Sequence, residues 1–233
     1  MNKTLDNYLN NSFICTKKTK DNWKANNIKV IGDIHGDFDV LIQSLKKAKV
    51  INKNHRWKGG KTHIVQLGDI LDRGGRPGVT TEVSDPMEEY KIYEFLNDLD
   101  IQAEKHGGKV HYLIGNHELM NMMGDFRYVH KNHMSNVDKR RQLFAPGGFM
   151  ANMLACHSYA VLKINDWYFC HAGLLPKHAG TKSITALNGF VRGVLRGEIT
   201  GGGRGNEYED ILSSNDSFFW NRFYVNNADK CTI

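Results

Sequence analysis

The stretch Gly68-Asp69-Ile70-Leu71-Asp72-Arg73-Gly74 decides the fold of this chain. It follows an apolar, β-prone run at 63–67 and ends in turn-forming glycines, which is typical of a buried strand that leads into a polar loop. Such a strand delivers two carboxylates, Asp69 and Asp72, and the guanidinium of Arg73 at its carboxyl end. Because open α/β sheets bind ligands at the carboxyl ends of their strands, the stretch predicts the functional edge of an α/β protein.

Three more strand-like runs end in side chains that can bind metals, and each is followed by glycine or a short polar turn. Within the first of them Asp33 and His35 are two residues apart, so on an extended end they share a face. One such unit alone is weak evidence, but several strand ends with the same chemistry together predict a metal centre. The runs and the motifs after them are 28–31 with Gly32-Asp33-Ile34-His35-Gly36, 110–114 with Gly115-Asn116-His117-Glu118, and 167–170 with His171-Ala172-Gly173.

The order of these motifs resembles that of the metallophosphoesterases with a calcineurin-like fold, and within them the phosphoprotein phosphatases. His171-Ala172-Gly173 stands where the eukaryotic serine/threonine enzymes usually have a second glycine, so the chain is most similar to the bacterial-like branch that includes the Shewanella-like phosphatases. The resemblance covers roughly residues 28–225. It implies a two-sheet αββα sandwich, an α/β fold with metals at the carboxyl edge between the sheets.

The resemblance also implies two divalent metal ions, with manganese expected first and iron or zinc as alternatives. It places Asp33, His35 and a bridging Asp69 on the first metal, and Asp69, Asn116 and His171 on the second. Phosphate monoesters are anions that resist attack by another anion. Two metals about 3.5–4 Å apart overcome this, because they generate a hydroxide for in-line attack at neutral pH and clamp the phosphoryl oxygens.

Four further residues receive catalytic roles by the same resemblance. His117, next to the ligand Asn116, is expected to be the general acid for the leaving oxygen. Asp72 would orient His117 and raise its basicity. Arg73 would grip the phosphate through its two-pronged guanidinium, and Arg222 is a second, weaker candidate for such a clamp.

One departure from the family pattern concerns the second metal. The family normally supplies one more histidine from a later strand, often in a Gly-His-Thr context, but this sequence has no histidine after His178 and ends at Ile233. We therefore expect a chain without the family's last strand or two and with a weak second metal site. A truncated chain, a split protein and a degenerate member of the family all remain open.

The domain organisation expected from the sequence is simple. Residues 1–27 are a polar lead-in with one strand around 13–15, and residues 28–233 form one metallophosphoesterase domain with a mostly helical insert at about 124–155. Apolar spacing predicts helices that start near Phe38 and Pro86, and another over 185–196. The runs 157–164 and 167–170 predict a hairpin of the second sheet, turned at Asn165-Asp166, and the glycine-rich 201–205 segment predicts a mobile loop.

The bulk composition is that of an ordinary globular protein, with 40% hydrophobic and 24% charged residues. No run is apolar enough to span a bilayer, and no signal peptide is recognisable, so we expect a cytoplasmic protein without a membrane partner. The four cysteines fit no zinc or redox spacing and are interpreted as reduced thiols.

The net charge is +6, with basic runs at 17–20 and 139–141. We interpret these runs as solvated surface, with attraction of an anionic partner as the alternative and nucleic acid not expected.

The sequence thus favours a hydrolase that removes phosphate from serine, threonine or tyrosine side chains of phosphoproteins, or from small phosphate esters. A dinucleoside polyphosphate hydrolase is the alternative enzyme, because it shares the same metal motifs. A catalytically weakened module that binds phosphate or protein is the alternative from another class, because the last ligand histidine is absent. The sequence does not separate serine/threonine from tyrosine specificity, and it does not indicate an oligomeric state.

Overall fold

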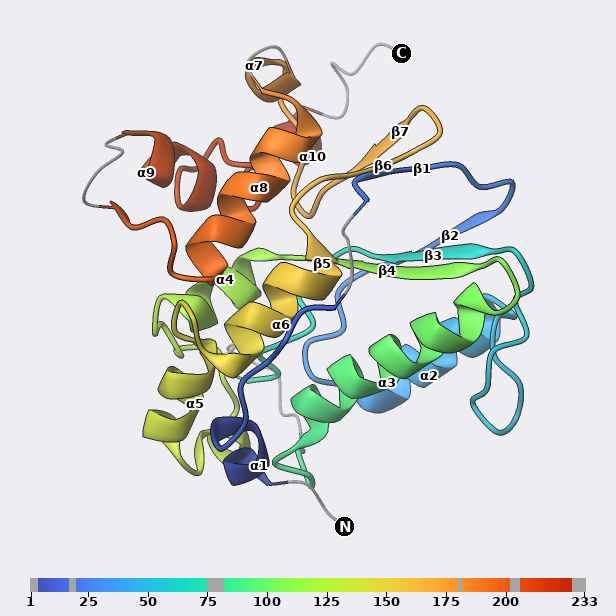
Figure 1. The fold of residues 1–233 in the computed structure, drawn as a ribbon, viewed down its shortest axis with the longest axis horizontal. Helices are drawn as coiled ribbons and strands as arrows, with labels where there is room; N and C mark the ends of the chain where they lie inside the picture. The colour runs from blue at the N-terminus through green and yellow to red at the C-terminus, as the bar shows by residue number, and fades with distance from the viewer. Residues whose placement is uncertain (1–3, 17–19, 75–81, 180–181, 202–205, 228–233) are drawn as a thin grey trace.

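The computed structural model describes residues 4–16, 20–74, 82–179, 182–201 and 206–227. Figure 1 shows two stacked sheets with helices against them and at one end. The strands are β1 (Asn22–Trp23), β2 (Ile28–Ile31), β3 (His63–Gln66), β4 (Lys109–Leu113), β5 (Ser158–Tyr159), β6 (Leu162–Ile164) and β7 (Trp167–Phe169). The helices are α1 (Leu5–Leu9), α2 (Phe38–Lys47), α3 (Glu88–Glu104), α4 (Asn116–Met122), the 3-10 helix η1 (Lys131–Met134), α5 (Val137–Phe144), α6 (Phe149–His157), α7 (Pro176–Ala179), α8 (Ile184–Leu195), α9 (Asn206–Leu212) and α10 (Phe223–Asn226).

The larger sheet has four parallel strands in the order β2-β3-β4-β5. Its central strands β3 and β4 are buried along their whole length, as expected for parallel strands covered on both faces. Helices α2 and α3 connect successive strands and cover one face of this sheet (Figure 1). The carboxyl ends of β2, β3 and β4 therefore meet at one edge, which is where the motifs of the sequence lie.

Helices α2 and α3 form where the apolar spacing predicts them. Asp37 caps α2 by accepting a hydrogen bond from the backbone N–H of Val40 at 2.9 Å, and Leu41 and Leu45 on its inner face are fully buried. Helix α3 begins with acidic residues and ends before the glycine pair at 107–108. Both predictions are confirmed.

The smaller sheet has the order β1-β6-β7, with β6 and β7 antiparallel. The predicted hairpin is confirmed for these two strands, and Asn165 at its turn has φ +54°. Ser158–Tyr159 departs from the prediction, because it pairs with β4 of the larger sheet. The chain changes sheets at Ala160 and Val161, whose backbone N–H groups donate to Oδ1 of the buried Asn188 on α8 at 2.8 and 3.1 Å.

The strand expected around residues 13–15 is wrong, because the described part of this segment has no regular secondary structure. Within the expected lead-in, β1 pairs instead with β6. The segment 124–155 is mostly helical as predicted and carries η1, α5 and most of α6. Helix α4 begins at Asn116, directly after Gly115. Most of the glycine-rich segment 201–205 lies outside the described residues.

The interpretation of the cysteines as reduced thiols is wrong for one pair. Cys15 and Cys156 form a disulfide with their Cα atoms 5.6 Å apart, although 141 positions separate them in the sequence. The amino-terminal segment runs alongside α6 in Figure 1, which brings the two thiols together. Cys170 is a free cysteine.

In the part of the chain that the structure describes, no helix combines the length and the apolar character needed to cross a bilayer.

Candidate active site

The loops after β3 and β4 touch at two glycines. Gly68 has φ +92°, and a Cβ atom at this position would lie 2.5 Å from the backbone nitrogen of Gly115. A Cβ atom on Gly115 would lie 2.2 Å from Oδ1 of Asp69. Both contacts are shorter than any side chain tolerates, so glycine is required at both positions. The two motifs are thus brought together by direct backbone contact.

Glu118 holds the loops after β3 and β4 in place through hydrogen bonds to their backbones. Its buried carboxylate accepts hydrogen bonds from the backbone N–H groups of Asp69 at 2.9 Å, Ile70 at 2.9 Å, Leu71 at 3.2 Å and Gly115 at 2.7 Å. The backbone of Asp69 has φ +52°, a conformation that costs free energy in a residue with a side chain. The bonds to Glu118 stabilise this conformation. Sequence analysis assigned Glu118 no role, because three of the four backbone positions it holds are 47 to 49 residues away.

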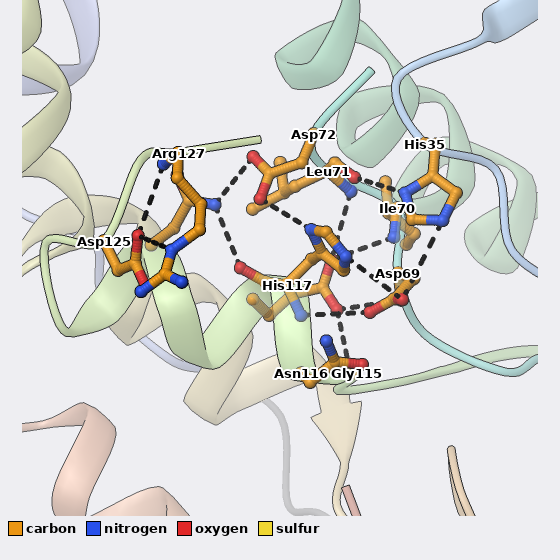
Figure 2. Close-up of polar contacts among 12 residues, drawn as sticks. His35, Asp69, Ile70, Leu71, Asp72, Gly115, Asn116, His117, Asp125 and Arg127 are labelled. Atoms are coloured by element: carbon orange, nitrogen blue, oxygen red, sulfur yellow. Dashed lines mark hydrogen bonds and ion pairs between the residues drawn. The ribbon is translucent and has the colours of Figure 1, made fainter. Parts of the chain in front are cut away.

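Asp69 is the centre of the cluster. Its Oδ2 lies 3.3 Å from Nε2 of His171, 3.8 Å from Nε2 of His117 and 3.9 Å from Nε2 of His35. Figure 2 shows Asp69 between His35 and His117. Asp33 is at the rim, half exposed, with Oδ2 3.8 Å from Nε2 of His35.

Asn116 completes the set of predicted ligands. Its Oδ1 lies 2.9 Å from Nε2 of His171. All the residues that the resemblance places on metals, namely Asp33, His35, Asp69, Asn116 and His171, therefore lie in one cluster.

The far nitrogen of each predicted imidazole ligand is held by a backbone carbonyl. Nδ1 of His35 lies 3.0 Å from the oxygen of Leu71, and Nδ1 of His171 lies 2.8 Å from the oxygen of Leu67. A carbonyl oxygen can only accept a hydrogen bond, so both rings carry a proton on Nδ1 and direct Nε2 toward Asp69. Metal-binding histidines are oriented in this way, so the donor set fits divalent metals.

The electrostatics of the cluster are those of imidazoles packed around a carboxylate. Burial alone would lower the pKa of His171, but the hydrogen bond and charge of Asp69 raise this pKa to about 9. Burial alone would raise the pKa of Asp69, but His171 and His117 hold it below its usual range. A bound cation would replace the proton on such an imidazole, because metal ligands must be deprotonated.

His117 is held by Asp72 as the sequence predicts. Nδ1 of His117 lies 2.8 Å from Oδ2 of the buried Asp72 (Figure 2). Burial lowers the pKa of His117, but Asp72 and Asp69 raise it above its usual value. The backbone N–H of His117 donates to Oδ1 of Asp69 at 3.0 Å. The ring therefore directs Nε2 toward the cluster and Nδ1 away from it.

Behind Asp72 lies a buried network that sequence analysis missed. Arg140, on α5, is fully buried and pairs with Oε2 of Glu89, on α3, at 2.6 Å. Burial alone would raise the pKa of Glu89, but the charge of Arg140 holds it far below its usual range. His133 lies against the same carboxylate, with Nδ1 3.3 Å from Oε1 of Glu89.

Because Arg140 is buried, the interpretation of the basic run 139–141 as solvated surface is wrong for this residue, while Arg141 is exposed. Residues 17–19 of the other basic run lie outside the described residues.

The two predicted phosphate clamps differ in their surroundings. The guanidinium of Arg73 pairs with Asp37 at 2.9 Å and Glu88 at 3.3 Å at the rim of the cluster. Arg222 donates to the backbone oxygens of Trp220 and Asn221 in its own turn, at 3.2 and 3.3 Å. A phosphate contact by either arginine stays a prediction.

Comparisons with known proteins point to one family, which is consistent with this geometry. The sequence profile of the calcineurin-like phosphoesterases matches residues 27–220. Shewanella-like protein phosphatase 2 of Arabidopsis thaliana is 31% identical over 253 aligned positions, which cover 89% of this chain and 61% of the plant protein. Shewanella-like protein phosphatase 1 of Plasmodium berghei is 32% identical, over 66% of this chain and 41% of that protein.

Solved structures give the same result. A crystal structure of the cold-active protein-tyrosine phosphatase of a psychrophilic Shewanella species is 27% identical in sequence, with a TM-score of 0.71 over 89% of this chain and 60% of that one. The chain belongs to the calcineurin-like phosphoesterase family, and its α/β sandwich is the fold of that family. It spans about three fifths of the length of the Arabidopsis relative and of the Shewanella structure.

Proposed function

We propose that this chain is a metal-dependent phosphomonoester hydrolase that acts on phosphorylated proteins. The observation that carries the proposal is the position of Oδ2 of Asp69, which faces the Nε2 atoms of three imidazoles within 3.9 Å. A buried carboxylate surrounded in this way is a ligand set for cations. Membership of a phosphoesterase family makes phosphate esters the substrate class to expect.

In this proposal Asp33 and His35 hold one divalent ion, Asn116 and His171 hold the other, and Asp69 lies between the two. Carboxylate, amide and imidazole donors suit manganese first, and iron or zinc as alternatives. Metals bound there would polarise the phosphoryl oxygens and activate water for attack. The chain contributes the fixed positions of these donors, which Glu118 and the carbonyls of Leu67 and Leu71 provide.

His117 supplies the proton in this proposal. Its Nε2 faces the cluster and its Nδ1 is held by Asp72 at 2.8 Å, so the ring can donate from Nε2 to the leaving oxygen of the ester. A leaving alkoxide is a strong base, and protonation lowers the barrier to its departure. Arg73 is the proposed contact for the phosphoryl group, because it lies at the rim and its guanidinium matches two phosphate oxygens.

The relatives suggest which phosphoproteins to test. Two curated relatives are named protein phosphatases, and the structural neighbour is named a protein-tyrosine phosphatase. We therefore propose phosphotyrosine peptides as the first substrates to test, with phosphoserine and phosphothreonine peptides of the same sequence beside them.

The proposal is tested by measuring phosphate release from these peptides, from p-nitrophenyl phosphate and from diadenosine tetraphosphate. The assays contain manganese, and the metal-stripped protein with chelator is the control. Metal-dependent release from at least one phosphopeptide is expected. Cleavage of the dinucleotide alone would identify the other hydrolase class. Metal binding without turnover on any ester would identify a binding module and overturn the proposal.

A further inference from the structure

We propose that Arg140 is a positioning residue for His117, and that it acts through Asp72. This inference rests on the proposed function, because it gives Arg140, which lies outside the metal cluster, a role in the proposed hydrolysis. Arg140 belongs to the basic run Lys139-Arg140-Arg141 at the surface of α5, yet its side chain is fully buried. A buried guanidinium has a large desolvation cost, so its hydrogen-bond and ion-pair partners must compensate that cost.

Two hydrogen-bond partners of Arg140 also contact Asp72, and Arg140 contacts Asp72 itself. Nε of Arg140 donates to Oδ1 of Asn121 at 2.8 Å, and Nδ2 of Asn121 donates to Oδ1 of Asp72 at 2.9 Å. Nη1 of Arg140 donates to Oε2 of Glu89 at 2.6 Å, and Oε1 of Glu89 accepts the backbone N–H of Asp72 at 2.7 Å. Nη2 of Arg140 lies 3.4 Å from Oδ1 of Asp72 itself. All three sets of contacts therefore connect Arg140 to Asp72.

The geometry decides which carboxylate oxygen of Asp72 faces His117. Oδ1 is occupied by Asn121 and Arg140, so Oδ2 is left for Nδ1 of His117 at 2.8 Å. Glu89 meanwhile holds the backbone of Asp72 at φ +72°, a strained value for a residue with a side chain. Without Arg140, the carboxylate of Asp72 can rotate and its backbone can relax, and either movement releases the ring of His117.

A purely structural salt bridge between α3 and α5 is the competing explanation. It predicts loss of stability and an equal loss of every activity. A positioning role predicts the largest loss in reactions that need the proton from His117, because the predicted ligands Asp69 and His171 are held by Glu118 and Leu67, outside this network. Nδ1 of His171, for example, contacts the oxygen of Leu67 and not this network.

The matched pair of variants is Arg140→Gln and Arg141→Gln. Arg141 is the next residue of the same helix, but it is exposed and pairs with Asp138 at 2.9 Å. Phenyl phosphate has a poor leaving group and p-nitrophenyl phosphate a good one. With manganese, Arg140→Gln should lower kcat on phenyl phosphate by about tenfold and on p-nitrophenyl phosphate by less than about threefold, since removing such supporting contacts costs roughly 10–100-fold. KM and metal content should not change, and Arg141→Gln should behave as the parent.

A double variant shows whether the effect passes through His117. In a His117→Asn background, Arg140→Gln should reduce kcat by less than about twofold, because the group it positions is already gone. A further loss equal to that of the single variant, or equal losses on both esters, would overturn the proposal. If Arg140→Gln does not fold, Glu89→Gln combined with Arg140→Gln removes both buried charges, and the same selective loss is expected.

A readout without turnover separates this inference from the proposed function. In protein labelled with ¹⁵N-histidine and free of metal, the Nδ1–H protons of His117 and His171 should both give protected NMR signals. The His117 signal is assigned by its absence in His117→Asn. Arg140→Gln should remove or shift it and leave the His171 signal, whereas Arg141→Gln should keep both. An unchanged His117 signal overturns the positioning role, even if the parent hydrolyses no ester and the proposed function fails.

Discussion

Nε2 of His171 lies 2.9 Å from Oδ1 of Asn116, although the two residues follow strands of different sheets. Asn116 opens α4 after β4 of the larger sheet, whereas His171 follows β7 of the smaller one. The predicted second metal site therefore bridges the sandwich. The predicted first site is built from the loops after β2 and β3 of one sheet only.

We expect this chain to bind one divalent ion firmly and a second one weakly. The second set is Asp69, Asn116 and His171, without the further histidine that the family pattern supplies, and even supporting residues of a metal site are worth roughly 10–100-fold in affinity. Manganese titration by calorimetry, with metal analysis after desalting, should show one retained ion and a second near millimolar concentration. Two tightly bound ions per chain would show that another group completes the site.

Asp69→Asn should reduce metal binding and turnover together. The substitution keeps the shape of the side chain but removes the charge that faces His171, His117 and His35. The measurements are the manganese content of the purified variant and its rate on p-nitrophenyl phosphate. Asp166→Asn, at an exposed turn, is the matched control and should bind metal as the parent does. Full metal content with full activity in Asp69→Asn would exclude a shared ligand.

His117→Asn should leave most of the metal binding intact while it slows hydrolysis. We expect a loss of about 10²–10⁴-fold on phenyl phosphate, because a general acid contributes on this scale. The loss should be much smaller on p-nitrophenyl phosphate, whose leaving group needs little protonation. Comparable losses on both esters would contradict the acid role, and loss of the metal itself would show that His117 acts as a ligand.

The parts of the site that could be predicted are those in which structure follows from neighbours in sequence. A β-prone run followed by glycine and a carboxylate or amide side chain predicts both the strand and the direction of its loop, and β2, β3 and β4 all follow this rule. Parallel pairing then places the loops at one edge. For this reason Asp33, Asp69 and Asn116 lie together as expected.

The parts that could not be predicted depend on partners distant in sequence. Arg140 lies 51 positions from Glu89 and 68 from Asp72, and in sequence it is indistinguishable from its exposed neighbour Arg141. Glu89 lies in the first turn of α3, where acidic residues are favoured, so its place in the sequence has a sufficient local explanation although the residue is in fact buried. Burial of a charge is a property of the packed fold and leaves no local pattern.

Glu118→Gln should destabilise the protein. The amide of glutamine has one acceptor oxygen, and its NH₂ group would face backbone N–H donors that the carboxylate now accepts. Leaving buried donors unsatisfied should cost on the order of 3 kcal/mol of unfolding free energy. Urea denaturation measures the change, with Glu198→Gln at an exposed position as the control. A change within about 0.5 kcal/mol, typical of surface substitutions, would show that Glu118 does not hold the loops.

Reduction of the Cys15–Cys156 disulfide should also lower stability, but not the metal affinity. The bridge closes a loop of 141 positions and so restricts the unfolded chain, and such bridges contribute about 2–4 kcal/mol. Denaturation with and without dithiothreitol measures the effect, and peptide mapping without reduction should recover the linked pair. Cys170→Ser, which removes the free thiol of the described residues, should show the same response to dithiothreitol as the parent. An identical denaturation midpoint in both conditions would contradict the prediction.

The contact between Gly68 and Gly115 has a consequence for protein engineering. A methyl group on Gly115 would meet Oδ1 of Asp69 at 2.2 Å, and one on Gly68 would meet the opposite backbone at 2.5 Å. Neither loop can therefore be diversified on its own, since any side chain added to one displaces the other. Libraries that aim to change substrate preference are better directed to an exposed side chain such as Arg127, because added volume there has solvent to occupy.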